Sequence, residues 1–229
     1  PEYKTNLTKN ERLSKNKQLF YDVLLYLNLP IVYGILIFGF CTFQQHNLQL
    51  YEVIGLLFSI GILLGSNGIN VAHELGHRNN LIAKITAKLL LLPSLYTHFT
   101  LEHNYGHHVH VSTPKDPATA RYNETVYAFW FRSVIQQYKS AWNIQMQLNK
   151  HNKTSFFSIN NEMLLNSLLQ ISYLLILYFS FGLKITIFAI FMGIIGFILL
   201  ESINYIEHYG LLRKQRKSGR FVPVKEIHS

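Results

Sequence analysis

Long apolar blocks without charge constrain this chain more than any other feature of its sequence. Residues 23–43, 53–72 and 163–183 contain no Asp, Glu, Lys or Arg. Residues 185–200 form a fourth, shorter block that runs into Glu201. A helix needs roughly 17–25 mainly apolar residues to cross a bilayer. We therefore predict four membrane spans, at about 23–43, 53–72, 163–183 and 185–203.

The composition points the same way. The 229 residues are 49% hydrophobic and 14% charged, whereas soluble domains carry about 25% charged residues. We expect an all-α, polytopic membrane helical bundle that forms one domain over residues 1–229. Residues 89–101 are apolar but too few to cross, which predicts a re-entrant or interfacial helix in addition to the four spans. Residues 109–162 are the sizeable polar segment, with an amphipathic helix expected on the inner membrane surface.

Lysine and arginine are distributed unevenly around the predicted spans. Residues 44–52 contain neither, and Lys184 alone lies between the third and fourth spans, so 20 of the 21 basic residues fall on the other side. The positive-inside rule places that side, with both termini and residues 109–162, in the cytoplasm. We attribute the net charge of +9 to topology and attraction to anionic lipid. No nucleic-acid module is recognisable, so nucleic-acid binding is not expected.

Three histidine motifs lie at the predicted cytoplasmic ends of the spans. Residues 73–78 read HELGHR, residues 102–108 read EHNYGHH, and residues 204–210 read NYIEHYG. Residues four apart on a helix share one face, so each of the first two motifs offers two imidazoles to one ion. Neutral imidazole suits iron, zinc, copper and nickel. The pattern predicts a metal centre at the membrane surface.

Each motif also contains a carboxylate beside a histidine. These residues are Glu74, Glu102 and Glu207. Metal-bound histidines usually donate their other N–H to an acceptor, often a carboxylate, which makes these three candidates for orienting the rings. Glu201, at the inner end of the fourth span, is either a functional residue or a marker of the interface. Cys41 is the only cysteine, so a cysteine-ligated electron-transfer centre must belong to another protein.

The motifs resemble those of the bacterial integral-membrane alkane 1-monooxygenases. The similarity includes all three histidine motifs, the run TPKDPA at residues 113–118, and residues 129–142, and it covers nearly the whole chain. The last motif, NYIEHYGL at residues 204–211, is the most specific because it is much rarer than a pair of histidines four apart.

The resemblance implies a membrane non-haem di-iron enzyme of the bacterial inner membrane, with its site facing the cytoplasm. Such an enzyme hydroxylates the terminal carbon of medium- or long-chain alkanes with O2, using electrons from rubredoxin and rubredoxin reductase. It has no catalytic side chain beyond the metal centre. The implied iron ligands are His73, His77, His103, His107, His108 and His208. Asp116 joins Glu74, Glu102 and Glu207 as a candidate partner of these ligands.

Two departures from the family pattern stand out. Arg78 occupies a position where the family more often has lysine. A last motif of the type HxxHH is absent, and the sequence ends at Glu226-Ile227-His228-Ser229, a segment that resembles the approach to that motif. The family also has additional N-terminal spans. We therefore expect an internal piece of a longer enzyme, supplying six of the ligands; His228 is not among them.

Other classes of protein share part of the pattern. Residues 73–77 also match the HExxH motif of zinc proteases, with Glu74 as the base, but that interpretation leaves the second motif and His208 unexplained. Histidine-box desaturases and xylene-type hydroxylases have the same metal chemistry. A metal transporter would place histidines within the spans rather than at their ends.

Overall fold

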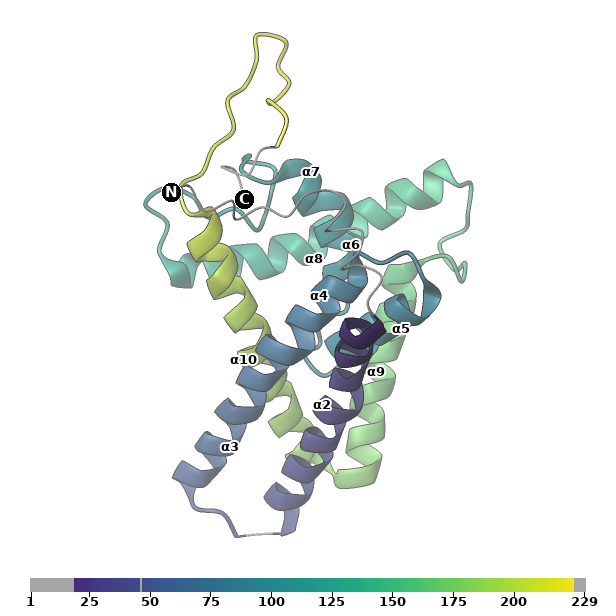
Figure 1. Cartoon of the computed structure of the whole chain (residues 1–229), viewed down its shortest axis with the longest axis vertical. Helices are drawn as coiled ribbons and strands as arrows, with labels where there is room; N and C mark the ends of the chain where they lie inside the picture. The colour runs from purple at the N-terminus through teal and green to yellow at the C-terminus, as the bar shows by residue number, and fades with distance from the viewer. Residues whose placement is uncertain (1–18, 46, 225–229) are drawn as a thin grey trace.

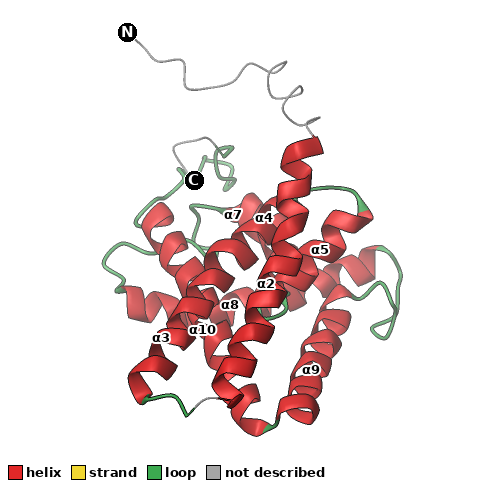
Figure 2. Cartoon of the chain, turned by 60° about the horizontal axis from the view of Figure 1, so that its bottom comes forward, coloured by secondary structure: helices red, strands yellow, loops and turns green. Residues whose placement is uncertain are grey.

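The computed structural model describes residues 19–45 and 47–224. The predicted all-α fold is confirmed in this part of the chain, where the regular secondary structure is helical apart from one isolated bridge between Gln215 and Phe221. The polar residues 1–18, His46 and His228 lie outside the described residues, and so do the predictions that fall on them. Figures 1 and 2 show the bundle from two directions.

Four long helical stretches match the predicted spans. They are α2 (Leu19–Gln45), the continuous series α3 (Leu50–Leu63), η1 (Leu64–Ile69) and α4 (Asn70–Gly76), α9 (Glu162–Phe181), and α10 (Leu183–His208). All four are long and apolar enough to cross a membrane. Large apolar side chains such as Phe38 and Phe179 are exposed on their outer faces, as expected where lipid covers the surface. The chain is a multi-pass membrane protein.

The boundary between the third and fourth spans differs slightly from the prediction. We expected the third span to extend to residue 183, but α9 ends at Phe181 and α10 begins at Leu183. Gly182 lies between them with φ +83°. Glycine adopts this left-handed conformation without a steric cost, and it ends a helix where the chain must reverse.

Close packing against α10 depends on small residues in the second span. A Cβ at Gly65 would lie 2.8 Å from Leu199 Cδ2 and 2.9 Å from the Gly196 carbonyl oxygen. A Cβ at Gly61 would lie 2.6 Å from Ile195. Glycine at these two positions lets the helix backbones approach closely, which is a common way for membrane helices to associate.

The apolar residues 89–101 do not form one helix, so that part of the prediction was wrong. Helix α5 (Leu81–Leu91) ends two residues before Pro93, residues 92–98 form turns with Leu95 at φ +53°, and α6 (Phe99–Glu102) begins afterwards. Proline lacks the N–H that would continue the helix.

The re-entrant path itself is present. The carbonyl oxygen of Leu90 packs against Gly68 in the second span, and that of Pro93 packs against Gly193 in α10. Further along the segment, the ring of His103 contacts the ring of His73. The segment thus enters and leaves the bundle on the histidine side. Its non-helical turn is buried among helices, where irregular backbone is tolerated in membrane proteins.

Helix α8 (Val126–His151) lies across the ends of the spans, on the side where α4, α6 and α7 (His108–His110) are found (Figure 1). This agrees with the amphipathic helix expected in residues 109–162. Its buried face is more polar than that of an ordinary amphipathic helix. The buried residues occur every four positions and are Phe129, Ser133, Gln137, Ala141, Gln145 and Asn149.

Candidate metal centre

The first histidine motif is carried by the end of the second span. The π-helical segment η1 leads into α4, which holds His73, and His77 follows as the residue that ends this helix. Asn104 of the second motif donates to the Gly76 carbonyl at 3.2 Å. This hydrogen bond holds the two motifs against each other.

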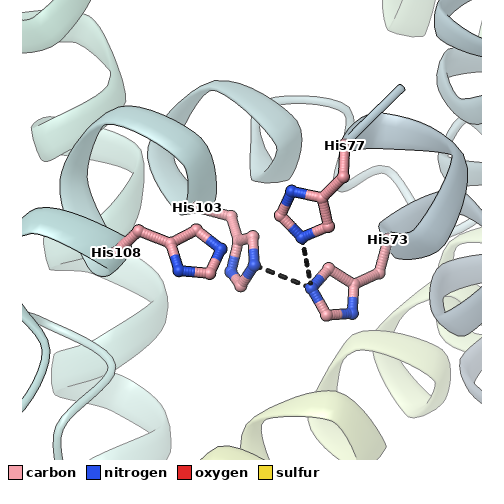
Figure 3. A group of neighbouring side chains, drawn as sticks. All are labelled: His73, His77, His103 and His108. Atoms are coloured by element: carbon pink, nitrogen blue, oxygen red, sulfur yellow. Dashed lines mark hydrogen bonds between the residues drawn. The ribbon is translucent and has the colours of Figure 1, made fainter. Parts of the chain in front are cut away.

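Four imidazoles from these motifs converge (Figure 3). One ring nitrogen from each of His73, His77, His103 and His108 lies within 4.8 Å of the others. Nε2 of His73 is 2.7 Å from Nε2 of His103 and 3.0 Å from Nε2 of His77. Nitrogens bound to one ion at about 2.0–2.1 Å lie roughly 3–4 Å apart. The donor set therefore fits a transition-metal ion that accepts imidazole ligands.

Within this four-histidine cluster, the surroundings of His103 and His108 favour neutral rings. Burial lowers the pKa of His103, and the neighbouring rings, beginning with His73, lower it further because adjacent positive charges repel. Burial and the charges of His107 and His77 lower the pKa of His108. A neutral imidazole keeps a lone pair free for a metal ion.

His107 does not join this cluster, although it is four residues from His103. Residues His103–His107 form the π-helical segment η2, and His108 rather than His107 completes the four-histidine group. His107 instead lies beside His208 of α10, with ring centroids 4.9 Å apart, and both side chains are buried. Nδ1 of His208 is buried without a hydrogen-bond partner among the described residues.

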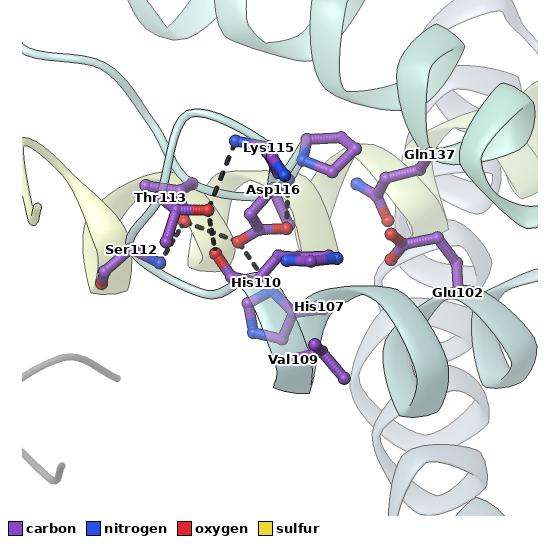
Figure 4. A network of polar contacts seen from close by, with 12 residues as sticks. Glu102, His107, Val109, His110, Ser112, Thr113, Lys115, Asp116 and Gln137 are labelled. Atoms are coloured by element: carbon purple, nitrogen blue, oxygen red, sulfur yellow. Dashed lines mark hydrogen bonds and ion pairs between the residues drawn. The ribbon is translucent and has the colours of Figure 1, made fainter. Parts of the chain in front are cut away.

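Asp116 fixes the orientation of His107 (Figure 4). Its Oδ2 lies 3.0 Å from Nδ1 of His107 and also accepts a 2.6 Å hydrogen bond from the Thr119 hydroxyl. Burial lowers the pKa of His107, but the hydrogen bond and charge of Asp116 outweigh burial and raise it. The same pair lowers the pKa of Asp116 despite its burial. The contact places a proton on Nδ1 and leaves Nε2 of His107 free.

The other three candidate carboxylates are placed differently. Glu74 and Glu207 are exposed, and Glu74 faces Arg78 at 3.7 Å. Glu102 is buried and accepts a hydrogen bond from the Ser140 hydroxyl at 3.2 Å. Burial, reinforced by the charge of Asp116, raises the pKa of Glu102 to about 7. Within the described residues, none of these three is hydrogen-bonded to a histidine, so their orienting role stays a prediction.

Sequence reasoning missed Arg213, which joins the second and third motifs. Its side chain is buried and donates to the Val109 carbonyl at 2.8 Å and to the Val222 carbonyl at 3.2 Å. Its backbone N–H donates to the Ser112 carbonyl at 2.7 Å. Arg213 begins a basic run, RKQRK, and a charge run usually indicates a solvated surface, so the sequence held no signal for this contact.

Comparison with known proteins agrees with this arrangement. Residues 50–226 match the family model described as fatty acid desaturase. The chain is 36% identical over 219 residues to the alkane 1-monooxygenase of Pseudomonas putida, covering 96% of this chain and 54% of that protein. It is 38% identical over 210 residues to alkane 1-monooxygenase 1 of Alcanivorax borkumensis, covering 92% and 52%.

A xylene/toluene monooxygenase hydroxylase component of Pseudomonas putida is 27% identical over 210 residues, covering 90% of this chain and 57% of that protein. The chain thus spans about half the length of the curated relatives it matches. Since the family model covers more than half of the 229 residues, including all three histidine motifs, this chain belongs to the fatty acid desaturase family.

Proposed function

We propose that this chain forms the metal-binding part of a membrane alkane 1-monooxygenase. The balanced reaction joins an alkane, O2, two electrons and two protons to give a 1-alkanol and water. The observation that carries the proposal is the four-histidine cluster, His73, His77, His103 and His108, with its ring nitrogens within 4.8 Å. Similarity to alkane 1-monooxygenases over 92–96% of the chain supports the substrate class.

We infer two iron ions. The four-histidine cluster would hold one, and His107 with His208 would contribute to the second. An alkane has no acidic proton and no polar group, so acid–base side chains alone cannot start its oxidation. Bound iron supplies the redox chemistry that activates O2, which redox-inert zinc does not supply.

The chain's own residues prepare this site. Phe99 packs against the rings of His103 and His73, with centroids 5.0 and 5.8 Å apart. Asp116 holds the proton of His107 on Nδ1. These contacts hold the imidazole rings in fixed orientations before a metal binds.

The proposed setting is the bacterial inner membrane, with the histidines on the cytoplasmic side. The distribution of lysine and arginine, 20 of 21 on the histidine side, supports this orientation. The reaction needs electrons that imidazole and carboxylate groups cannot supply. We propose that rubredoxin, with rubredoxin reductase, delivers them, and a basic cytoplasmic face suits an acidic carrier.

The direct experiment measures metal content and product together. The full-length enzyme that contains this chain is purified in detergent, its iron is counted, and octane is supplied with O2, rubredoxin, rubredoxin reductase and a nicotinamide reductant. We expect two irons per chain and 1-octanol as the product. His73→Ala should abolish both, whereas His151→Ala, at an exposed histidine that ends α8, should change neither.

The product also separates the related chemistries. Methyl hydroxylation of xylene with no attack on octane would favour the hydroxylase that matches at 27% identity. Formation of a double bond in a fatty acyl chain would favour desaturation, the activity in the name of the family model. A single zinc ion together with peptide cleavage would contradict an oxygenase altogether.

A further inference from the structure

A buried carboxylate lies within the fourth span, beneath the histidines. Glu201 of α10 is 0% exposed. It precedes His208 by seven residues, which is about two helical turns, so the two side chains lie on the same face of α10 roughly 10 Å apart along its axis. A carboxylate at this depth in an apolar helix is costly, which makes a functional role the first hypothesis.

Glu201 is held by neutral hydrogen-bond donors from several elements. The Tyr96 hydroxyl donates to Oε1 at 3.0 Å and the Ser133 hydroxyl donates to Oε2 at 2.6 Å. Nε2 of Gln137 lies 2.9 and 3.0 Å from the two carboxylate oxygens. In the described part of the chain, no lysine or arginine forms an ion pair with Glu201.

Each of these donors belongs to a segment that positions a histidine. Tyr96 lies in the re-entrant turn that leads into α6 and η2, which carry His103 and His107. Ser133 and Gln137 lie on the buried face of α8, and Ser140 on the same helix donates to Glu102 beside His103. Glu201 therefore joins the helix of His208 to both segments that support the second motif.

Apolar packing alone would not fix this alignment. Close glycine contacts align α10 with the second span and with Pro93 of the re-entrant turn. Helix α8 has a largely polar buried face and offers no comparable apolar contact that would align it with α10. Directed hydrogen bonds are different, because a displaced Glu201 would leave Tyr96, Ser133 and Gln137 buried without partners. The cost of an unsatisfied buried group selects one register of α10.

We propose that Glu201 is a positioning residue that sets the register of α10 against α8 and the re-entrant turn, so that His208 meets His107. The inference rests on the proposed function, because it assumes that these two histidines hold a metal ion. Glu201 contacts neither metal nor substrate, and it acts through the helix that carries His208.

Three variants test the role. Glu201→Leu removes every hydrogen bond to this side chain, Glu201→Gln keeps the shape and most of the hydrogen bonds, and Thr186→Val is the matched control. Thr186 is another buried polar residue of α10, but its hydroxyl donates only to the Gly182 carbonyl one turn earlier. If Glu201→Leu does not accumulate in the membrane, Gln137→Leu removes one donor and should act in the same direction.

The first measurement is an anaerobic titration of the metal-free protein with Fe²⁺ alone. We expect Glu201→Leu to weaken binding of the second equivalent on the order of tenfold or more, as for other residues that support metal ligands. The first equivalent, at the four-histidine cluster, should bind as in the wild type. Glu201→Gln should restore the second equivalent. The proposal would be overturned if both Glu201 variants lost the same affinity for the second equivalent of Fe²⁺. It would also be overturned if Thr186→Val lost as much affinity as Glu201→Leu.

The second measurement needs no metal. The exposed residues Met146 of α8 and Ile206 of α10 are each replaced by cysteine in a Cys41→Ser background, and a spin label is attached to each. The distribution of distances between the two labels is then recorded. Glu201→Leu should shift or broaden it, and Glu201→Gln and Thr186→Val should not. An unchanged distribution in Glu201→Leu would refute the positioning role. If the wild type binds no Fe²⁺, the proposed function fails, and this distance still tests Glu201.

Discussion

His208 lies against His107, with ring centroids 4.9 Å apart, although α8, α9 and the rest of α10 lie between them in the chain. Both side chains are buried. Together with the four-histidine cluster of His73, His77, His103 and His108, this pair gives two neighbouring groups of imidazoles at one end of the bundle. The rings of His103 and His107 stack at 5.2 Å and connect the groups.

Asp116→Asn should weaken metal binding without unfolding the protein. Oδ2 accepts hydrogen bonds from His107 and Thr119, and Oδ1 accepts one from the Ala118 N–H. The amide lacks the negative charge and has one acceptor oxygen instead of two, so it cannot keep all three bonds. Loss of such a partner typically costs 10–100-fold in metal affinity. Competition between the protein and a chelator for Fe²⁺ measures the change. Glu162→Gln, at an exposed carboxylate paired with Lys88, is the control, and an Asp116→Asn affinity equal to wild type would contradict the assignment.

Arg213→Ala should loosen the contact between the second and third motifs. The variant loses the hydrogen bonds to the Val109 and Val222 carbonyls and leaves them without that donor, at a cost of about 1–3 kcal/mol. We expect faster hydrogen exchange at residues 109–113 and weaker binding of the second Fe²⁺. Arg216→Ala, at an exposed position in the same basic run, should show neither effect. If residues 109–113 exchange hydrogen at the same rate in both variants, the contact of Arg213 is not stabilising.

Gly65→Ala should destabilise the bundle. The added methyl would lie 2.8 Å from Leu199 and 2.9 Å from a backbone oxygen of α10, and overpacking of this kind costs about 1–3 kcal/mol. The matched control is Gly34→Ala in α2, where nothing lies within 4 Å of the added carbon. Thermal unfolding in detergent compares them. A Gly65→Ala midpoint at or above that of Gly34→Ala would show that α3, η1 and α10 pack less closely than described.

The pair formed by Glu124 and Arg132 should make stability depend on acid pH. Burial raises the pKa of Glu124, but hydrogen bonds from Arg132 and from the Arg121 backbone outweigh burial and lower it. A carboxylate with a depressed folded pKa adds stability above its ordinary pKa of about 4.3. That stability disappears as the pH falls through the lower, folded value.

The corresponding experiment compares thermal unfolding of the wild type and Glu124→Gln at pH 7 and at pH 3.5. At pH 7 the variant should be less stable by about 1.5–3 kcal/mol, the contribution of a hydrogen bond to a charged group. At the lower pH the difference in stability between the wild type and the variant should become smaller. A constant difference across this range would mean that the ionised carboxylate of Glu124 contributes nothing specific.

The sequence predicted what depends on local composition. Four apolar blocks were sufficient to locate four spans, because crossing a bilayer sets both the length and the polarity of a helix. The spacing of His73 and His77 predicted their shared face, and the two rings lie 4.8 Å apart. The prediction failed at residues 89–101 because it rested on their apolar character alone. Pro93 was a local signal for a break in the helix, whereas the positive φ of Leu95 was not visible in the sequence.

Tertiary structure decided the grouping of the histidines. Spacing alone pairs His103 with His107, yet His103 and His108 join the first motif, while His107 lies with His208 and Asp116. Arg213 and the contacts of Glu201 were equally invisible, since their partners lie far away in the chain. Periodicity and polarity report how each helix meets lipid or water. The partners of a buried polar group depend on how whole helices pack, and no single stretch of sequence contains that information.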